Sequence, residues 1–421
     1  MLLRLRLMSL FSKDARIMLN SIKELEIPKD QLYIHDDELC PCGSGKSYLN
    51  CCKNKPDPGP VKSPKPAEVV IMEQMRAYKK RLKFCLHPDQ TLCQGSIKEA
   101  HALQNHKIIS LLAGSDNHVI MQDHTKRPLV LDKNPFNPDV IVLFDKVSGN
   151  KATTQSCFCD LHDTELFRVI EAGAPDFDPN NEEMKFVYAY KAFIFEYAKQ
   201  IKLMSVWRES FSKRPQVFSM PELVKIYRIQ SKRIDEFEFV KKHFDSEILS
   251  GTHNGIDTCV ITIPYQIGFA NYAYISPDFD LNGEKIQNID KEGKMHRLAV
   301  SVIPENNRSY ITLSCLSSEE NIFHSFFTQI STSRLEKILY YFNIMLPLFS
   351  ENLVLSKELW NTHNEMGQMG LTHLANLKGD DHFRMSHTFG MALRNAAKMK
   401  NMDYSKYGEI NLFQSVCNSL Y

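Results

Sequence analysis

Apolar side chains recur at three- and four-residue steps along residues 182–213, where Phe186, Tyr190 and Phe193 share one face. This spacing is typical of an amphipathic α-helix. The same pattern predicts a second helix over residues 221–247. An aromatic stripe at helical spacing is typical of a protein core rather than of a surface that stacks nucleic-acid bases. We therefore expect both helices to pack against the rest of the molecule.

Downstream of Gly251 the pattern changes from helical to extended, and then becomes helical again. Runs of β-branched residues predict strands, with turn residues at Asn282-Gly283 and Asn306-Asn307. Downstream of Gly251 the predicted strands cover residues 256–263, 298–303 and 310–316, and the later helices cover 320–346 and 351–365. Two further strands are predicted upstream, over residues 118–121 and 139–144. This order predicts an α+β fold whose C-terminal domain contains an antiparallel sheet.

Four cysteines lie within thirteen residues near the start of the chain: Cys40, Cys42, Cys51 and Cys52. Two thiol pairs joined by a short reversing loop supply the four soft ligands that tetrahedral Zn²⁺ prefers. The loop between the pairs contains two glycines, which permit a sharp backbone path. Four protein ligands leave no position open for water or substrate, so we predict a structural zinc site.

The run from Cys40 to Cys52, CPCGSGKSYLNCC, resembles the SEC-C motif, the small zinc knuckle of the SecA translocation ATPase and of many otherwise unrelated bacterial proteins. The resemblance covers residues 36–55. It implies that the four cysteines bind zinc and that the knuckle docks a protein or nucleic-acid partner, in the SecA case the SecB chaperone or the ribosome. It does not imply ATPase activity. Gly45-Lys46-Ser47 imitates the end of a phosphate-binding loop, but Cys40 stands where that loop requires its first glycine.

A second set of candidate ligands is spread over a longer stretch of the chain. Cys85 and Cys93 lie eight positions apart, and Cys159 and His162 have Cys-x-x-His spacing at the predicted start of a helix. The order of loop thiols, hairpin and Cys-x-x-His helix resembles a treble-clef zinc finger. This resemblance implies a second Zn²⁺ in a zinc-finger-like module.

The sequence leaves alternatives for the ligands of this second set. Cys157 and His101 are substitutes for the four ligands, and Asp163 or a backbone carbonyl is the expected partner that fixes the tautomer of His162. The alternative interpretation is a group of unrelated buried thiols and surface histidines. The sequence therefore predicts one zinc ion from the first set and a second from this one.

Treble-clef scaffolds also carry HNH endonucleases, which suggests a second class of function. In that interpretation His101 is the general base, Asn117 or His118 is the loop residue, and His162 helps to hold Mg²⁺ beside the scissile phosphate. The sequence departs from the family pattern because the residue before His101 is Ala100 and because zinc binding would occupy His162. By analogy, such a nuclease would serve defence against foreign DNA.

Composition and charge place this chemistry in a cellular context. The 421 residues have a net charge of +1, which gives no overall attraction to nucleic acid or anionic membranes. Eleven cysteines in a chain without an apparent export signal favour metal binding in the reducing cytoplasm. No apolar run is long enough for a membrane span. The basic run Arg76–Lys83 either contacts nucleic-acid phosphates or is only a solvated face.

We expect the chain to be divided into several units. These are a helical lead-in (1–35, with a helix over 13–27), the zinc knuckle (36–55), a proline-rich linker (56–67), the zinc-finger-like module (68–175) and a helical domain with an antiparallel sheet (176–421). The linker predicts a knuckle on an extended arm, free to find its partner. Four histidines near the C-terminus, His363, His373, His382 and His387, are expected to be exposed.

Overall fold

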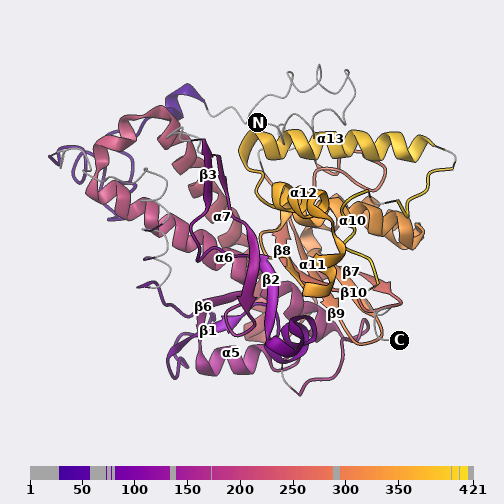
Figure 1. Cartoon of the computed structure of the whole chain (residues 1–421). Coiled ribbons are helices and arrows are strands. Elements are labelled where there is room, and N and C mark those ends of the chain that lie inside the picture. Colours follow the sequence, from indigo (N-terminus) through magenta and orange to yellow (C-terminus); the bar gives the residue numbers. More distant parts are fainter. Residues whose placement is uncertain are drawn as a thin grey trace.

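The computed structural model describes residues 28–56, 73, 77, 81–132, 139–171, 173–287, 294–399, 401–406 and 408–415. The predicted helix over residues 13–27 and residues 57–67 of the predicted linker lie outside the described residues. Helices and antiparallel sheets share the described part of the chain (Figure 1). None of the described helices is both long and apolar enough to cross a membrane.

Helices and strands are numbered separately, each in the order in which they occur along the chain. The helices are α4 (Ser110–Ala113), α5 (Asp160–Phe167), α6 (Glu182–Lys213), α7 (Pro221–Ser250), α9 (Glu320–Thr332), α10 (Leu335–Phe349), α11 (Lys357–Thr362), α12 (Glu365–Ala375) and α13 (Gly379–Lys398). The strands are β1 (Ile97–His101), β2 (His118–Gln122), β3 (Leu129–Asp132), β4 (Asp139–Ile141), β5 (Phe144–Ser148), β6 (Thr154–Cys159), β7 (Ile256–Ile263), β8 (Phe269–Ile275), β9 (Leu298–Pro304), β10 (Ser309–Leu316) and β11 (Val354–Leu355). Short helical segments include η2 (Lys29–Leu32), η3 (Asn105–Ile109) and η5 (Pro215–Ser219).

Seven strands form one antiparallel sheet in the order β5-β2-β11-β8-β9-β10-β7. Side chains alternate between its faces as the period of two requires. On β9, Val300 and Val302 belong to the apolar cluster on one face, whereas Ala299 and Ile303 belong to the cluster on the other. Strands β2 and β5 lie in the same sheet as β7–β11, so the sheet crosses the domain boundary that the sequence predicted at residue 175.

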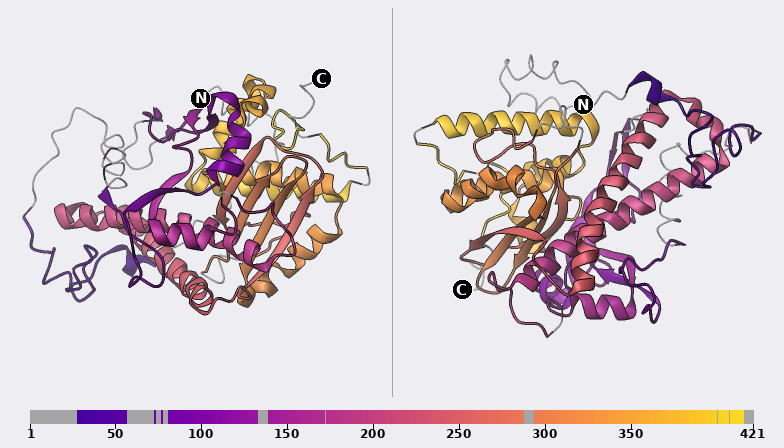
Figure 2. Two further views of the ribbon diagram at one scale, coloured as in Figure 1. Left: turned by 90° about the horizontal axis from the view of Figure 1, so that it is seen from below. Right: turned by 180° about the vertical axis from the view of Figure 1, so that it is seen from behind.

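Helices cover both faces of this sheet. Helix α6 packs on β8, β9 and β10, while α9 and α10 pack on the opposite side (Figures 1 and 2). The predicted bounds of α6 are confirmed, and α7 runs three residues beyond its predicted end to a left-handed cap at Gly251 (φ 67°). Together, α6 and α7 form a helical hairpin joined by η5, and its tip extends away from the sheet (Figure 2).

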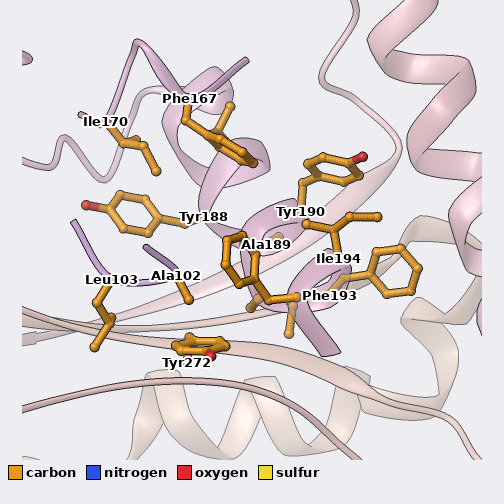
Figure 3. Packing of buried hydrophobic residues seen from close by; sticks show 14 of the residues in the cluster. Ala102, Leu103, Phe167, Ile170, Tyr188, Ala189, Tyr190, Phe193, Ile194 and Tyr272 are labelled. Atoms are coloured by element: carbon orange, nitrogen blue, oxygen red, sulfur yellow. The ribbon is translucent and has the colours of Figure 1, made fainter. Parts of the chain in front are cut away.

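The aromatic stripe of α6 is confirmed as core. Phe186, Tyr190 and Phe193 are all buried in the cluster that also contains Tyr272 of β8, and Figure 3 shows Tyr190, Phe193 and Tyr272. The ring centroids of Phe193 and Phe244, from α7, lie 5.1 Å apart. Burial of this many large rings stabilises the contact between the hairpin and the sheet.

Three predicted elements were wrong in extent or type. The helix expected over 320–346 is two helices, because the backbone is extended at Ser333 and Arg334, where Thr and Ser replace strong helix formers. The segment expected to be helical over 351–365 begins instead with β11, which pairs with β2 and β8. The strand expected over 139–144 is divided between β4 and β5. In the last two cases, pairing with distant strands overrides local preference.

Candidate metal centres

The first thiol set lies on a tight two-stranded turn. An isolated bridge pairs Leu39 with Ser47, and Gly43 and Gly45 between them have φ values of 79° and 74°. Left-handed values of this kind favour glycine. The carbonyl oxygen of Tyr48 then accepts hydrogen bonds from the amides of residues 51, 52 and 53. This local fold returns the second cysteine pair to the first.

The four sulfur atoms of this first centre are arranged as a metal site requires. All four lie within 4.8 Å of one another. The Sγ of Cys51 is 3.5 Å from that of Cys42 and 3.7 Å from that of Cys52. Tetrahedral Zn–S bonds of about 2.3 Å place sulfur atoms about 3.8 Å apart. All four cysteines are free, so the cluster matches a zinc site rather than a disulfide pair.

The electrostatics of the first centre favour a cation. Burial raises the pKa of the Cys40 and Cys52 thiols. Burial also acts to raise that of Cys42, but hydrogen bonds from Ser44 and the neighbouring thiols bring its pKa down to about 6. The lowered pKa of Cys42 favours its thiolate, whereas burial favours the protonated thiols of Cys40 and Cys52 until a metal ion displaces the protons.

The knuckle is packed against the tip of the α6–α7 hairpin, so the expectation of a unit free on an arm is wrong. Cys40 and Cys52 form one buried cluster with Phe211 of α6 and Val224 of α7. The rings of Tyr48 and Phe211 meet edge to face at 5.8 Å. The cysteine side chains have too little apolar surface to form a core by themselves. The side chains at the tip of the hairpin supply the rest of that core.

Arg228 of α7 fixes the knuckle in place. Its guanidinium lies 2.6 Å from the Glu38 carboxylate and donates hydrogen bonds to the carbonyl oxygens of Tyr33 (2.9 Å) and Gln31 (3.3 Å). Burial acts to raise the pKa of Glu38, but its contact with Arg228 lowers it overall. No sequence signal marks this residue, because Arg228 lies in an ordinary amphipathic pattern.

We expect the Arg228→Ala variant to bind zinc but to hold the knuckle more loosely. Three charge-assisted hydrogen bonds are lost and Glu38 keeps a partly buried charge, which together cost about 1–3 kcal/mol of docking free energy. Hydrogen exchange of the amides of residues 33–52 should accelerate. The Lys213→Ala control removes only an exposed pair with Glu209 and should leave that exchange unchanged. Unchanged protection in Arg228→Ala would show that the clamp is dispensable.

The second centre is assembled at one end of the β1–β6 ribbon. Ile97 of β1 pairs with Cys159 at the end of β6, and α5 begins at the next residue, which places His162 in its first turn. The loop that carries Cys85 and Cys93 is held against this ribbon: the amide of Leu86 donates to the carbonyl oxygen of residue 157 at 2.9 Å. The long insertion between β1 and β6 does not separate the ligands.

The structure brings together the four residues that the sequence predicted as the second set. The Nδ1 atom of His162 is 3.3 Å from the Sγ of Cys159, 3.4 Å from that of Cys85 and 3.7 Å from that of Cys93. Zn–S and Zn–N bonds of about 2.3 and 2.0 Å give a tetrahedral S···N separation of about 3.5 Å. Cys157, the proposed substitute, is fully buried outside this cluster.

The surroundings of His162 differ from the expectation. Its Nε2 is buried and has no hydrogen-bond partner in the described part of the chain, so neither Asp163 nor a described backbone carbonyl fixes the tautomer. The ring of His87 stacks on it instead, with centroids 3.7 Å apart and planes 10° apart. The sequence missed His87, whose only signal is its place between Cys85 and Cys93. Burial lowers the pKa of His87, which favours its neutral ring.

His101 lies at the far end of β1 from this centre. It pairs with Thr154, four positions from the pair that reaches Cys159, and its Nε2 is 3.2 Å from the carbonyl oxygen of Gly149. Burial lowers the pKa of this imidazole, so its neutral form is favoured. Among the described residues, no group of three metal-binding side chains includes His101.

The other residues of the nuclease interpretation do not all lie near Gly149. Asn117, with a left-handed φ of 52°, accepts the amide hydrogen of Gly149 on its carbonyl oxygen at 2.8 Å. His118 contacts Asp116 instead, through its Nδ1 and the carbonyl oxygen at 2.6 Å. His162 lies in the cysteine cluster. The structure therefore brings His101 and Asn117 to one turn but leaves His162 at the other end of the ribbon.

The basic run Arg76–Lys83 is described only in part, at residue 77 and from residue 81 onward. Arg81 is 65% exposed and pairs with Glu209 at 3.5 Å. The adjoining Phe84 packs on the core, beneath the ammonium group of Lys202 at 5.5 Å. These contacts anchor the end of the run to α6.

None of the four C-terminal histidines is exposed as the sequence predicted. His363 is buried; its Nδ1 is 2.9 Å from the carbonyl oxygen of Leu359, and its Nε2 accepts the amide hydrogen of Asn411 at 3.1 Å. It therefore fastens the C-terminal segment to α11. His373, His382 and His387 are half-buried.

We expect the stability of the fold to fall as the pH drops below about 6.5. Burial lowers the folded-state pKa of His363 and of His101, so the unfolded chain binds more protons in this range. The contribution of each such histidine is complete above its unfolded pKa and is lost as the pH falls toward its folded-state pKa. Denaturant unfolding at pH 7 and 5.5 measures it. The difference between the two pH values should shrink in His363→Gln, and an equal difference would contradict this account.

Comparisons of the chain with protein-family models, with curated proteins and with solved structures found no match. The SEC-C, treble-clef and HNH resemblances therefore rest only on the residues named above. What the geometry itself supports is two cysteine-rich clusters that fit zinc.

Proposed function

We propose that this chain is a zinc protein with two structural ions and that its SEC-C-like knuckle docks a protein partner. The observation that carries the proposal is the pair of clusters, each with four ligand atoms within 4.8 Å. Four protein ligands fill the coordination sphere of Zn²⁺, so both ions serve to hold the fold. Catalysis at zinc, which needs an open position, is not favoured by either set.

The outward side of the knuckle supports a protein partner. One side rests on α6 and α7, but Leu39 is 73% exposed and Leu49 is 44% exposed. Apolar side chains beside a metal-ordered turn are suited to the centre of a protein interface, and phosphate binding would need a cluster of basic residues. The SEC-C resemblance points to a SecB-like chaperone or to the ribosome.

Binding of the full-length chain to purified SecB-type chaperone and to purified ribosomes tests this proposal. We expect one of them to bind the zinc-loaded chain and to bind Leu39→Glu at least tenfold more weakly. Leu249→Glu is the matched control, because Leu249 is 64% exposed at the distant end of α7. Equal binding by both variants, or binding of neither partner, would contradict docking through this face.

A second candidate function is an HNH-like, Mg²⁺-dependent nuclease acting in defence against foreign DNA. The observation that favours it is the order β1, β6, α5 with the cysteine cluster at one end and the half-buried His101 at the other. The neutral imidazole of His101 is the form that a general base needs. Strained backbone also gathers there, since Asn117 and Thr153 both have positive φ.

Cleavage of single- and double-stranded DNA with and without Mg²⁺ tests the nuclease. His101→Ala should abolish cleavage while leaving the zinc content at that of the unmodified chain. His106→Ala, which alters an exposed histidine in the next segment, should retain activity. If the unmodified chain does not cleave DNA, or if His101→Ala cleaves as well as it does, this candidate is excluded.

A further inference from the structure

A small internal space lies where three parts of the fold meet. It is lined by the segment that follows β1, by α6 and by β8 and β9. Figure 3 shows Ala102, Leu103 and the rings of Tyr188 and Tyr272 around it. The space open to the centre of a water molecule is about 10 Å³. That is close to the minimum for a single water and too small for any larger ligand.

One polar side chain in this wall has no partner. Gln104 is 1% exposed, and neither its Nε2 nor its Oε1 makes a hydrogen bond with the described part of the chain. Burial raises the pKa of the nearby Tyr188 hydroxyl, and the Gln104 amide partly opposes that rise, but the two groups do not form a hydrogen bond of normal geometry. A buried amide left without any partner is costly, so such groups are nearly always satisfied by protein or by ordered water.

The same wall supplies further hydrogen-bonding groups. Ser301 of β9 is 4% exposed and Lys191 of α6 is 3% exposed. The ammonium group of Lys191 also pairs with the carboxylate of Glu171. Together with Gln104 and Tyr188, these residues give a small molecule several donors and acceptors from three different elements. A buried water characteristically makes about three hydrogen bonds.

We propose that this space is a binding site for one ordered water molecule that satisfies Gln104. The water joins the segment after β1 to α6 and to the central strand β9. It therefore attaches the part of the chain that carries the second metal centre to the large sheet. This site is independent of the proposed docking function and of either zinc ion.

Substitution of Gln104 by methionine tests the proposal, because the variant should be less stable if the water is present and more stable if it is absent. If the amide is satisfied by water, Gln104→Met removes hydrogen bonds and strands that water, so the unfolding equilibrium constant should rise about fivefold. Gln122→Met is the matched control, because Gln122 is also buried and its Nε2 donates to the carbonyl oxygens of Val142 and Ala375. Both variants should be destabilised. A more stable Gln104→Met would overturn the proposal, because it would mean that the amide is unsatisfied and the space is dry.

If the variant does not fold, a crystal structure of the unmodified full chain tests the proposal instead. A high-resolution crystal structure should show one water within hydrogen-bonding distance of the Gln104 amide. The absence of water density at this position would refute the site.

Discussion

Replacement of Cys159 by serine is expected to reduce the zinc content from two ions to one and to lower the stability of the whole fold. Cys159 is 1% exposed and belongs to the main buried cluster, together with Phe158, Phe167 and Tyr190. Loss of the ion leaves the buried Cys85 thiol and the buried ring of His162 without the metal that they would bind. Loss of a structural metal costs on the order of 5 kcal/mol. Thermal unfolding and elemental analysis of the same sample measure the two effects.

The matched control for this prediction is the neighbouring Cys157. It is as deeply buried as Cys159, but its sulfur is outside the ligand cluster. Cys157→Ala should therefore keep two zinc ions and lose only about 1–2 kcal/mol from the small cavity. If Cys157→Ala loses an ion while Cys159→Ser retains both, the ligand set is wrongly assigned.

Replacement of Cys51 by serine is expected to empty the first centre and to release the knuckle from the hairpin. Cys51 lies beside Cys40 and Cys52, whose buried sides cover Phe211 and Val224. Without the ion, no metal bonds join the two cysteine pairs of the turn. The knuckle then leaves the hairpin, and the tip of α6 and α7 becomes exposed. Trp207 packs on this cluster, and its fluorescence should shift to longer wavelength. We expect a loss of about 2–4 kcal/mol, smaller than at the second centre because this cluster is small.

Cys259→Ser controls for the loss of a thiol as such. Cys259 is a free, half-buried cysteine of β7 outside both clusters. It should retain two ions and the original fluorescence. Trp360 is the other tryptophan, so the shift should vanish in a Cys51→Ser/Trp207→Phe double variant. A shift that persists there would place the change away from the knuckle and contradict the release.

The ligand clusters could be predicted from the sequence because the chemistry of each is partly local. The pairs Cys40–Cys42 and Cys51–Cys52 are joined by a turn that the glycines make short. For the second set, Cys159 and His162 are placed by one helix start, and only the return of the Cys85 loop is a long-range event. The pattern identified the residue types, and the strand pairing of β1 with β6 brought them together.

The docking of the knuckle could not be predicted, because its contacts are distant in the sequence. Phe211 and Val224 continue ordinary amphipathic helix patterns and carry no mark of their partner. Likewise, β11 is only two residues long and owes its conformation to pairing with β2 and β8. His363 was expected at the surface because polar sequence surrounds it, but the C-terminal segment folds back and buries it.

The central claim is that two Zn²⁺ ions hold this fold, and elemental analysis of the freshly purified, reduced full-length chain tests it most directly. The account predicts two zinc ions per chain and eight ligand atoms protected from thiol and imidazole reagents until a chelator removes the metal. A chain that is folded without zinc, with the thiols at 40, 42, 51 and 52 freely reactive, would contradict it.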